Sequence, residues 1–459
     1  MIRLYNTLTR QIEEFTPQIP KHVKIYTCGP TVYDYQHIGN YSGYIYWDTL
    51  VRLFLLEGYS VERVINITDV GHLVSDSDEG EDKLEKGAKR DGKTAREVAD
   101  YFTEDFFKNA ERLNFIKPKL YAKATDYIAQ QQDIINLLLK KGYAYQTEQA
   151  IYFATNKLTD YGKLTGQKLE DKEIGARDSV VTDEAKHHPQ DFALWFFTVG
   201  RFDDHEMHWA SPWGDGFPGW HLECSAIIHS TLEESIDIHA GGIDHIGTHH
   251  TNEIAQSEAA FDKPLSKLWL HNNHMSVDGK KISKSLNNGY TIDDLLERGY
   301  TTDDFRMLVL QSHYRSQSKF TWESLDATRA NLQSFINWAD LTYQDTQKAN
   351  LDDEELLKSS LVKALNDDLN TPQALAALNM FDLSLAPSKG LLQYIDSLFG
   401  FSLGARPDIT DDQKRLIDLR NQARDKQDWE SSDQLRFALA KEGVELNDGS
   451  RETTWQRQS

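Results

Sequence analysis

Two cysteines and a His/Glu pair supply donor atoms that could bind a metal ion. Cys28 and Cys224 lie far apart in the chain, and His249 and Glu253 are four residues apart. On a helix, that spacing places both side chains on one face. Sulfur, nitrogen and carboxylate oxygen form a donor set that Zn²⁺ accepts in a tetrahedron. Because the donors come from distant segments, the spacing alone leaves a second interpretation open, in which they are unrelated core residues.

Two other stretches are suited to binding phosphate. His37-Ile38-Gly39-Asn40 stands between a predicted strand at 23–26 and a predicted helix at 41–57. Helix N-termini attract anions, and parallel sheets bind ligands at the carboxyl ends of their strands. The segment 279–286, Gly-Lys-Lys-Ile-Ser-Lys-Ser-Leu, places lysines among serines in a loop. Taken singly, Cys28 and His37 are better explained as a core thiol and a loop histidine; the stretches together predict a nucleotide site.

These segments resemble the class I aminoacyl-tRNA synthetases and, among them, the cysteinyl-tRNA synthetase family. Residues 37–40 match the His-x-Gly-His signature of the class, with Asn40 in place of the last histidine. Residues 281–285 match its Lys-Met-Ser-Lys-Ser signature, with Ile282 in place of Met. An Asn amide can still donate a hydrogen bond. The cysteine-specific matches are Cys28 and the segments 220–226, 237–239, 241–244 and 249–257.

The resemblance implies a zinc ion in each subunit and three substrates, namely L-cysteine, ATP with Mg²⁺, and tRNA(Cys). The implied metal ligands are Cys28, Cys224, His249 and Glu253. The implied lining of the cysteine pocket is Gly29, Thr68, Trp220 and His239. The implied ATP contacts are His37, Gly39, Asn40, Gly241, Gly242, Asp244, Lys281, Ser283 and Lys284. Of these, the catalytic residues are His37, Asn40, Lys281 and Lys284.

The implied reaction has two steps. The cysteine carboxylate attacks the α-phosphate of ATP, and a ribose hydroxyl of the tRNA then attacks the cysteinyl-adenylate. Neither step needs a protein nucleophile, so catalysis consists of positioning and of stabilising charge on phosphate oxygens. Shape alone separates cysteine from serine poorly, whereas zinc prefers a thiolate to a hydroxyl.

The composition is that of a globular protein with several domains. The chain has 459 residues and a net charge of -22, from 50 basic and 72 acidic residues. This balance does not by itself indicate RNA binding, although local basic patches can hold phosphates. The chain shows neither a membrane-length apolar run nor a signal peptide at its start, so we expect a cytoplasmic protein without a membrane partner. Nothing implies an obligate protein partner.

Alternating strand and helix patterns predict an α/β fold, a Rossmann-like nucleotide-binding catalytic domain. We expect an inserted connective domain, followed by a helical bundle and a small C-terminal anticodon-binding domain, as the family has. The expected parts are 1–116 and 210–290 for the two catalytic halves, 117–209 for the insertion, 291–325 for a linking stem, 326–400 for the bundle and 405–459 for the C-terminal domain.

Several segments carry more local predictions. We expect a solvated polar loop at 71–95, helices at 97–115 and 124–141, and strands at 142–146, 150–154 and 192–197. In the tail, cationic and aromatic residues form a mixture suited to stacking on unpaired bases. A small helical cap with a solvated basic face is the alternative. The tail residues concerned are Lys414, Arg420, Arg424, Trp429, Trp455 and Arg457.

Two rival functions remain open at this point. A mycothiol-type cysteine ligase shares the zinc and adenylate chemistry but passes cysteine to an amino-sugar inositol. It generally lacks a C-terminal RNA-binding part, which residues 408–459 match here. The second rival is an inactive paralogue that binds zinc and tRNA; Asn40 is the one feature in its favour. ATP–pyrophosphate exchange separates an active enzyme from an inactive one.

Overall fold

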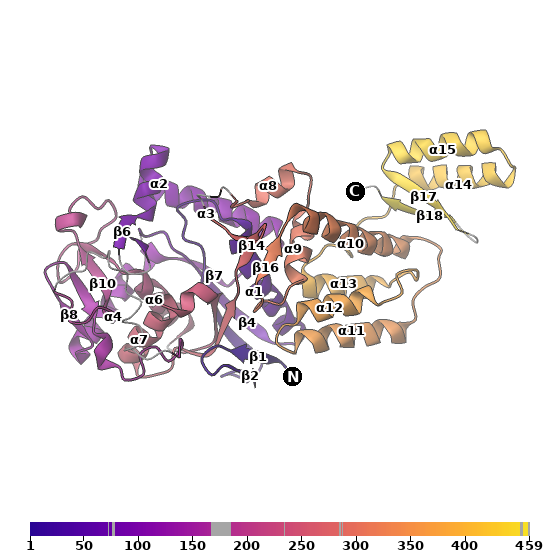
Figure 1. The fold of residues 1–459 in the computed structure, drawn as a ribbon. Helices are drawn as coiled ribbons and strands as arrows, with labels where there is room; N and C mark the ends of the chain where they lie inside the picture. Colours follow the sequence, from indigo (N-terminus) through magenta and orange to yellow (C-terminus); the bar gives the residue numbers. More distant parts are fainter. Residues whose placement is uncertain are drawn as a thin grey trace. The chain divides into compact units, whose positions relative to one another are not determined.

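The chain forms two compact units (Figure 1). The computed structural model describes residues 1–71, 73–75, 79–166, 185–233, 235–283, 286, 288–449 and 453–457. Lys284, predicted to contact ATP, lies outside these described residues. The first unit contains Met1–Asp294, Tyr314–Lys319 and Asn366–Leu369, and the second contains the rest of the chain.

A five-stranded sheet in the order β13-β12-β3-β4-β7 organises the first unit. Each neighbouring pair is parallel, which confirms the predicted Rossmann-like α/β fold. The chain leaves β3 towards β4 on one side and β12 towards β13 on the other. The crevice between the carboxyl ends of β3 and β12 is therefore where such a sheet binds its ligand. The strands are β3 (His22–Thr27), β4 (Ser60–Ile67), β7 (Leu120–Lys123), β12 (Ile236–Gly242) and β13 (Ser266–Asn272).

Helix α1 (Ile38–Leu56) begins three residues before the predicted start at Tyr41. His37 is its N-cap: the His37 ring accepts a hydrogen bond from the Asn40 amide, and the Asn40 side chain accepts one from the His37 amide. The reciprocal bonds satisfy two backbone donors that a helix start leaves free. The prediction placed the start too late because neither His at the N-cap nor Asn at N3 is a usual capping-box residue.

Two more helices position the site. They are α6 (Trp220–Leu232) and α7 (His249–Phe261), and most of the residues of each are buried. Side chains of α6 such as Ile227 and Ile228 pack in one apolar cluster with Tyr26 of β3 and Val64 of β4. Burial on all sides fits their sequences, which lack a charged face.

A four-stranded antiparallel sheet, in the order β11-β10-β9-β8, forms the inserted part. The strands are β8 (Ala144–Gln146), β9 (Ala150–Phe153), β10 (Phe192–Phe197) and β11 (Gly216–Pro218). The strands predicted at 150–154 and 192–197 are thereby confirmed. Helix α4 (Ile128–Lys141) precedes the sheet and ends at Gly142, whose φ of 77° favours glycine. Apolar residues of this sheet share a core with α6 and α7.

The prediction of a polar loop across 71–95 was wrong. The structure has a hairpin of β5 (Leu73–Ser75) and β6 (Glu79–Asp82), followed by α2 (Lys83–Asp91) and the start of α3 (Ala95–Arg112). The Asp82 carboxylate accepts hydrogen bonds from the Leu84 and Glu85 amides and caps α2. Asp82 also lies 2.9 Å from the buried His205 ring. An acidic cluster that looked solvated therefore supplies a buried helix cap.

Six further elements are short, and the last two named here continue along the chain from the first unit into the second. They are β1 (Arg3–Asn6), β2 (Gln11–Glu14), β14 (Met275–Val277), β15 (Lys280–Lys281), β16 (Ser318–Phe320) and α8 (Ile292–Glu297). Among the described helices, none has both the length and the apolar character that spanning a membrane requires.

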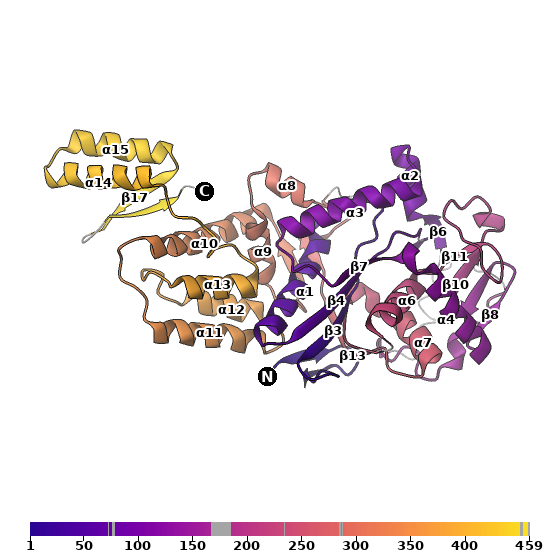
Figure 2. The same cartoon turned by 180° about the vertical axis from the view of Figure 1, so that it is seen from behind.

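The second unit is largely helical (Figure 2). Side-chain caps from Thr301, Thr321, Asn370 and Thr410 begin four of its helices. The helices are α9 (Thr302–Leu310), α10 (Trp322–Asp340), α11 (Leu351–Leu365), α12 (Thr371–Asn379), α13 (Lys389–Phe399), α14 (Asp411–Asp425) and α15 (Trp429–Lys441). A hairpin of β17 (Val444–Asp448) and β18 (Thr453–Arg457) follows.

Two tail residues predicted to contact RNA serve the fold instead. Trp455 is only 7% exposed and packs in a small core with Leu439 and Leu446. Arg420 is buried and donates two hydrogen bonds of 2.5 Å to the Asp448 carboxylate. The pattern of charges and aromatics did not distinguish these residues from Trp429, which is 59% exposed.

Candidate metal and nucleotide site

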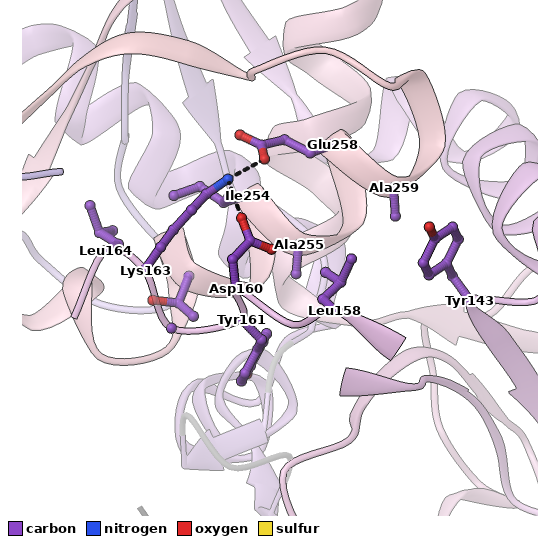
Figure 3. A pocket seen from close by; sticks show the side chains of 12 residues that line it. Tyr143, Leu158, Asp160, Tyr161, Lys163, Leu164, Ile254, Ala255, Glu258 and Ala259 are labelled. Carbon is purple, nitrogen blue, oxygen red and sulfur yellow. Dashed lines mark hydrogen bonds and ion pairs between the residues drawn. The ribbon is translucent and has the colours of Figure 1, made fainter. Parts of the chain in front are cut away.

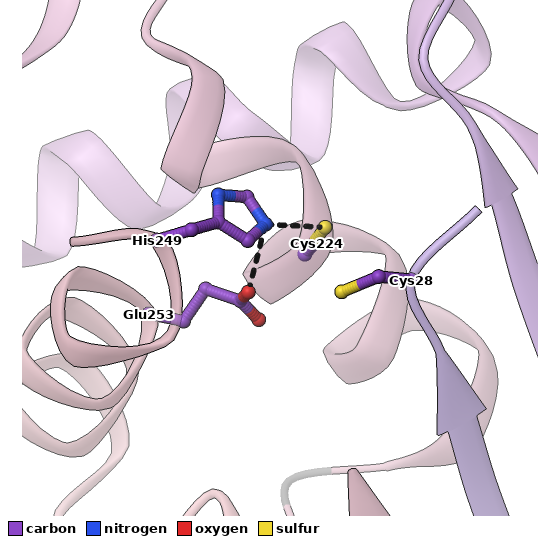
Figure 4. A group of neighbouring side chains, drawn as sticks. All are labelled: Cys28, Cys224, His249 and Glu253. Atoms are coloured by element: carbon purple, nitrogen blue, oxygen red, sulfur yellow. Dashed lines mark hydrogen bonds and ion pairs between the residues drawn. The ribbon is translucent and has the colours of Figure 1, made fainter. Parts of the chain in front are cut away.

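Four donor atoms converge at the carboxyl end of β3 (Figure 4). Cys28 follows β3, Cys224 lies in α6, and His249 and Glu253 lie one turn apart in α7. The four side chains are buried, and one donor atom of each lies within 4.8 Å of the others. The His249 Nε2 atom is 3.5 Å from Cys224 Sγ and 2.9 Å from Glu253 Oε1.

These residues fit a zinc ion. Tetrahedral bonds of about 2.0–2.3 Å place neighbouring ligand atoms roughly 3.3–3.8 Å apart. The observed separations of 3.5 Å and 2.9 Å, within a set spanning at most 4.8 Å, need only small side-chain shifts to reach that geometry. Two sulfurs, one imidazole nitrogen and one carboxylate oxygen are all donor types that zinc accepts.

Histidines surround this donor set. The Nε2 atom of His250 lies 3.1 Å from Cys28 Sγ, and that of His239 lies 2.8 Å from Glu253 Oε2. Behind His250, its Nδ1 lies 2.8 Å from Nε2 of His271. His250 and His271 were not predicted as site residues from the sequence, although the adjacent His249-His250 pair is a visible signal.

The electrostatics of the pocket favour positive charge among the donors. Burial alone would raise the pKa of Glu253, but the charges of His239 and His249 hold it below its usual range. Burial alone would lower the pKa of His249, but Glu253 and Cys28 raise it to about 10. Burial also opposes ionisation of Cys28, yet its bond to Cys224 and the charge of His250 lower its pKa. A cation at the centre would meet two ligands, Cys28 and Glu253, already poised as anions, whereas burial and the neighbouring Cys28 raise the pKa of the Cys224 thiol.

The four residues predicted to line the cysteine pocket lie around these donors. The Gly29 amide donates to the Asn66 side chain at 2.7 Å, and Asn66 donates to the Thr68 hydroxyl at 2.9 Å. A Cβ at position 29 would lie 1.7 Å from the Asn66 carbonyl oxygen, so only glycine fits. The Trp220 ring stacks on the His249 ring with centroids 4.3 Å apart. His239, the fourth, is the partner of Glu253 described above.

The two predicted signature segments lie side by side. A Cβ at Gly39 would come within 2.7 Å of the Ile282 side chain and 3.1 Å of the His37 ring. The Ser283 amide donates to the Asn288 side chain at 2.9 Å. Burial lowers the pKa of His37, so its ring is neutral at pH 7. Because its Nδ1 accepts the Asn40 amide, the proton of the neutral ring lies on Nε2.

The glycines at the end of β12 bring the backbone close to the histidine cluster. A Cβ at Gly241 would lie 2.7 Å from the His250 ring, and one at Gly242 would lie 2.5 Å from the Asp244 carboxylate. A side chain at Gly241 would clash with the buried His250 ring, and one at Gly242 would displace the Asp244 carboxylate. The Asp244 side chain thus stands at the carboxyl end of the strand, where the sheet binds ligands.

A pocket opens on the side of α7 that faces away from His249 and Glu253 (Figure 3). The Tyr161 hydroxyl donates to Asn252 at 2.6 Å. Lys163 bridges Glu258 of α7 and Asp160, the latter at 3.1 Å. These bonds fasten the helix that carries His249 and Glu253, and no sequence signal indicated them. The apolar walls come from Tyr143, Leu158, Ile254, Ala255 and Ala259.

Known proteins resemble this chain over nearly its whole length. The family model of the tRNA synthetases class I (C) catalytic domain matches residues 14–330. A cysteine–tRNA ligase of Treponema denticola is 37% identical, covering 99% of this chain and 99% of the relative. Cysteine–tRNA ligase 1 of Burkholderia lata is 40% identical, covering 97% of this chain and 95% of the relative.

Solved structures share the fold. The methionyl-tRNA synthetase of Mycobacterium tuberculosis, bound by methionyl-adenylate, covers 82% of this chain and 83% of its own with a TM-score of 0.57 at 15% identity. The parallel sheet, the paired signature segments and the matched family model all indicate the same class of enzyme. The chain therefore belongs to the class I aminoacyl-tRNA synthetases, in the cysteine–tRNA ligase family.

Proposed function

We propose that this protein is a cysteine–tRNA ligase, which activates L-cysteine with ATP and transfers it to tRNA(Cys). The observation that carries the proposal is the buried Cys28, Cys224, His249 and Glu253 set at the carboxyl end of β3. A sheet of this kind binds nucleotides at that edge. The relatives from Treponema denticola and Burkholderia lata support the same activity.

The four donors hold one Zn²⁺ ion in this proposal. When bound, zinc supplies a site that prefers the thiolate of cysteine to the hydroxyl of serine. That preference matters because a pocket separates near-isosteric side chains by only ~1–3 kcal/mol through shape. Gly29, Thr68, Trp220 and His239 surround the donors and line the cysteine pocket. Accuracy then rests on binding, without a separate editing domain.

The signature residues bind ATP, which carries Mg²⁺. The Nε2–H group of neutral His37 donates to a phosphate oxygen, since Nδ1 is engaged by Asn40. The Asn40 amide group donates a second bond while its oxygen caps α1. Lys281 and Lys284 neutralise charge on the departing pyrophosphate, and Ser283 adds a hydroxyl.

The nucleoside binds at the end of β12. Gly241 and Gly242 let the adenosine approach the backbone, and Asp244 accepts hydrogen bonds from the ribose hydroxyls. Gly39 gives the same close approach at the start of α1. The attacking carboxylate and the α-phosphate are thereby held together. This positioning is the main source of rate enhancement in a reaction without a protein nucleophile.

The six-part division is the domain organisation that we propose. Residues 1–116 and 210–290 perform the chemistry, 117–209 form the connective insertion, and 405–459 read the anticodon. Residues 291–325 and 326–400 form the stem and bundle between them. We place the reaction in the cytoplasm, where translation occurs. The second candidate is a ligase that activates cysteine with the same zinc and adenylate chemistry but transfers it to a different acceptor.

The test is the charging of total tRNA with labelled cysteine in the presence of ATP and a serine competitor. We expect acid-precipitable product that carries cysteine and not serine. Cysteine-dependent ATP–pyrophosphate exchange without charged tRNA would indicate another acceptor. Loss of both activities would contradict the proposed enzyme.

A further inference from the structure

The pocket contains a second donor set that overlaps the first. Cys28, His239, His250 and Glu253 also place one donor atom each within 4.8 Å of the others, and all four are buried. We propose that these residues form a second seat for a divalent cation, which retains the ion when Cys224 cannot contribute. The inference rests on the metal centre of the proposed function. Because the seats share Cys28 and Glu253, they hold one ion at a time.

The distances in the second seat suit a metal ion. Cys28 Sγ and His250 Nε2 are 3.1 Å apart, and His239 Nε2 and Glu253 Oε2 are 2.8 Å apart. His250 Nε2 lies 3.9 Å from Glu253 Oε1. These values bracket the roughly 3.3–3.8 Å between ligands of a tetrahedral ion with bonds of about 2.0–2.3 Å. One ion can therefore reach all four donors after small adjustments.

Outer contacts aim both histidines into the seat. His250 Nδ1 is engaged by His271, whose own Nδ1 lies 2.8 Å from the Thr7 hydroxyl. These two contacts leave His250 Nε2 directed at Cys28. Metal-binding histidines in proteins are oriented in this way, by a hydrogen bond at the ring nitrogen that does not bind the metal. The His239 ring stacks on Trp269 with centroids 4.5 Å apart. Packing thus fixes its orientation towards Glu253.

Charge and donor type divide the two seats between different ions. With two thiolates and a carboxylate, a divalent ion in the first seat leaves a net charge of about −1, whereas one thiolate and one carboxylate leave the second seat neutral. Burial disfavours the charged complex. Zinc gains from a second thiolate, so it favours the first seat; ions that prefer nitrogen favour the second.

The experiment compares Cys224→Ala, His250→Ala and the double variant with the wild-type protein. Each is loaded with Zn²⁺ or Co²⁺, dialysed against a weak chelator and analysed for metal content and visible absorption. We expect both single variants to retain one ion per chain and the double variant to lose it. Cobalt in Cys224→Ala should show about half the thiolate charge-transfer intensity of His250→Ala, since one thiolate is bound instead of two.

Cys28→Ala is the matched control, because it removes a donor from both seats and should bind no ion. If Cys224→Ala loses metal as completely as Cys28→Ala while its circular dichroism is unchanged, the second seat does not exist. If Cys224→Ala does not fold, Cys224→Ser replaces it with the same expected and contradicting results. A wild-type protein that binds neither ion would overturn the metal centre of the proposed function itself, a separate outcome.

Discussion

Replacing Asn40 with alanine should loosen the start of α1 by a predictable amount. The substitution removes the bond from the His37 amide to the Asn40 side chain, which is 3.1 Å long. Loss of such a cap costs ~1 kcal/mol, or about a fivefold shift in the local opening equilibrium. Hydrogen–deuterium exchange of a peptide covering 33–44 measures this opening directly, without requiring the whole chain to unfold in one step.

Asn40→Asp is the matched control, because aspartate keeps the accepting oxygen and favours a helix N-terminus. We expect hydrogen–deuterium exchange of the 33–44 peptide in this variant to resemble that in the wild-type protein. Its carboxylate lacks the donor and repels phosphate, so ATP–pyrophosphate exchange should still fall, by ~10²-fold. If the 33–44 peptide of Asn40→Ala exchanges hydrogen for deuterium at the wild-type rate, the capping role is refuted. If Asn40→Asp catalyses ATP–pyrophosphate exchange at the wild-type rate, the phosphate contact is refuted.

Other substitutions test the remaining parts of the site. Cys28→Ala should abolish metal binding and let serine support ATP–pyrophosphate exchange, which metal analysis and a serine titration measure. Lys284→Ala should slow adenylate formation ~10²–10³-fold in single-turnover assays and leave metal content unchanged. Tyr161→Phe should weaken zinc ~10-fold in a chelator competition, because it frees Asn252 of α7. Asp448→Ala should speed hydrogen–deuterium exchange across 444–457, because it removes the carboxylate partner of the buried Arg420, at a cost of roughly 2 kcal/mol.

Patterns local to one element predicted much of the fold. The apolar run at Phe192–Phe197 is a strand with the predicted bounds, and Gly142 ends α4 in the left-handed conformation. Both follow from short-range physics, namely burial of an apolar run and the freedom of glycine at positive φ. The α/β class of the fold also followed from the alternation of strand and helix, whereas the order of strands in the sheet was not predicted.

Features that depend on unusual caps or tertiary contacts could not be predicted. Helix α1 begins at Ile38 through a histidine cap, and α2 begins after Asp82, whose carboxylate is buried beside His205. In isolation, both stretches have the polar composition of loops. Trp455 likewise gave no sign that it belongs to the core of the hairpin.

The candidate site, like the fold, was predictable only where the signal lay within one element. The spacing of His249 and Glu253 placed two donors on one helix face, and the structure brings both cysteines to them. The second donor set needs the register in which His239 of β12 pairs with Tyr26 of β3. That register results from sheet assembly, so no spacing along the chain reveals it.

The most direct test of the account is the visible spectrum of the cobalt-loaded protein during titration with cysteine and, separately, with serine. We expect cysteine to increase the thiolate charge-transfer band, because its sulfur joins the donors around the ion, and serine to leave the band unchanged. Equal responses to both amino acids, or no response to cysteine, would contradict selection of the substrate thiolate by the buried donor set.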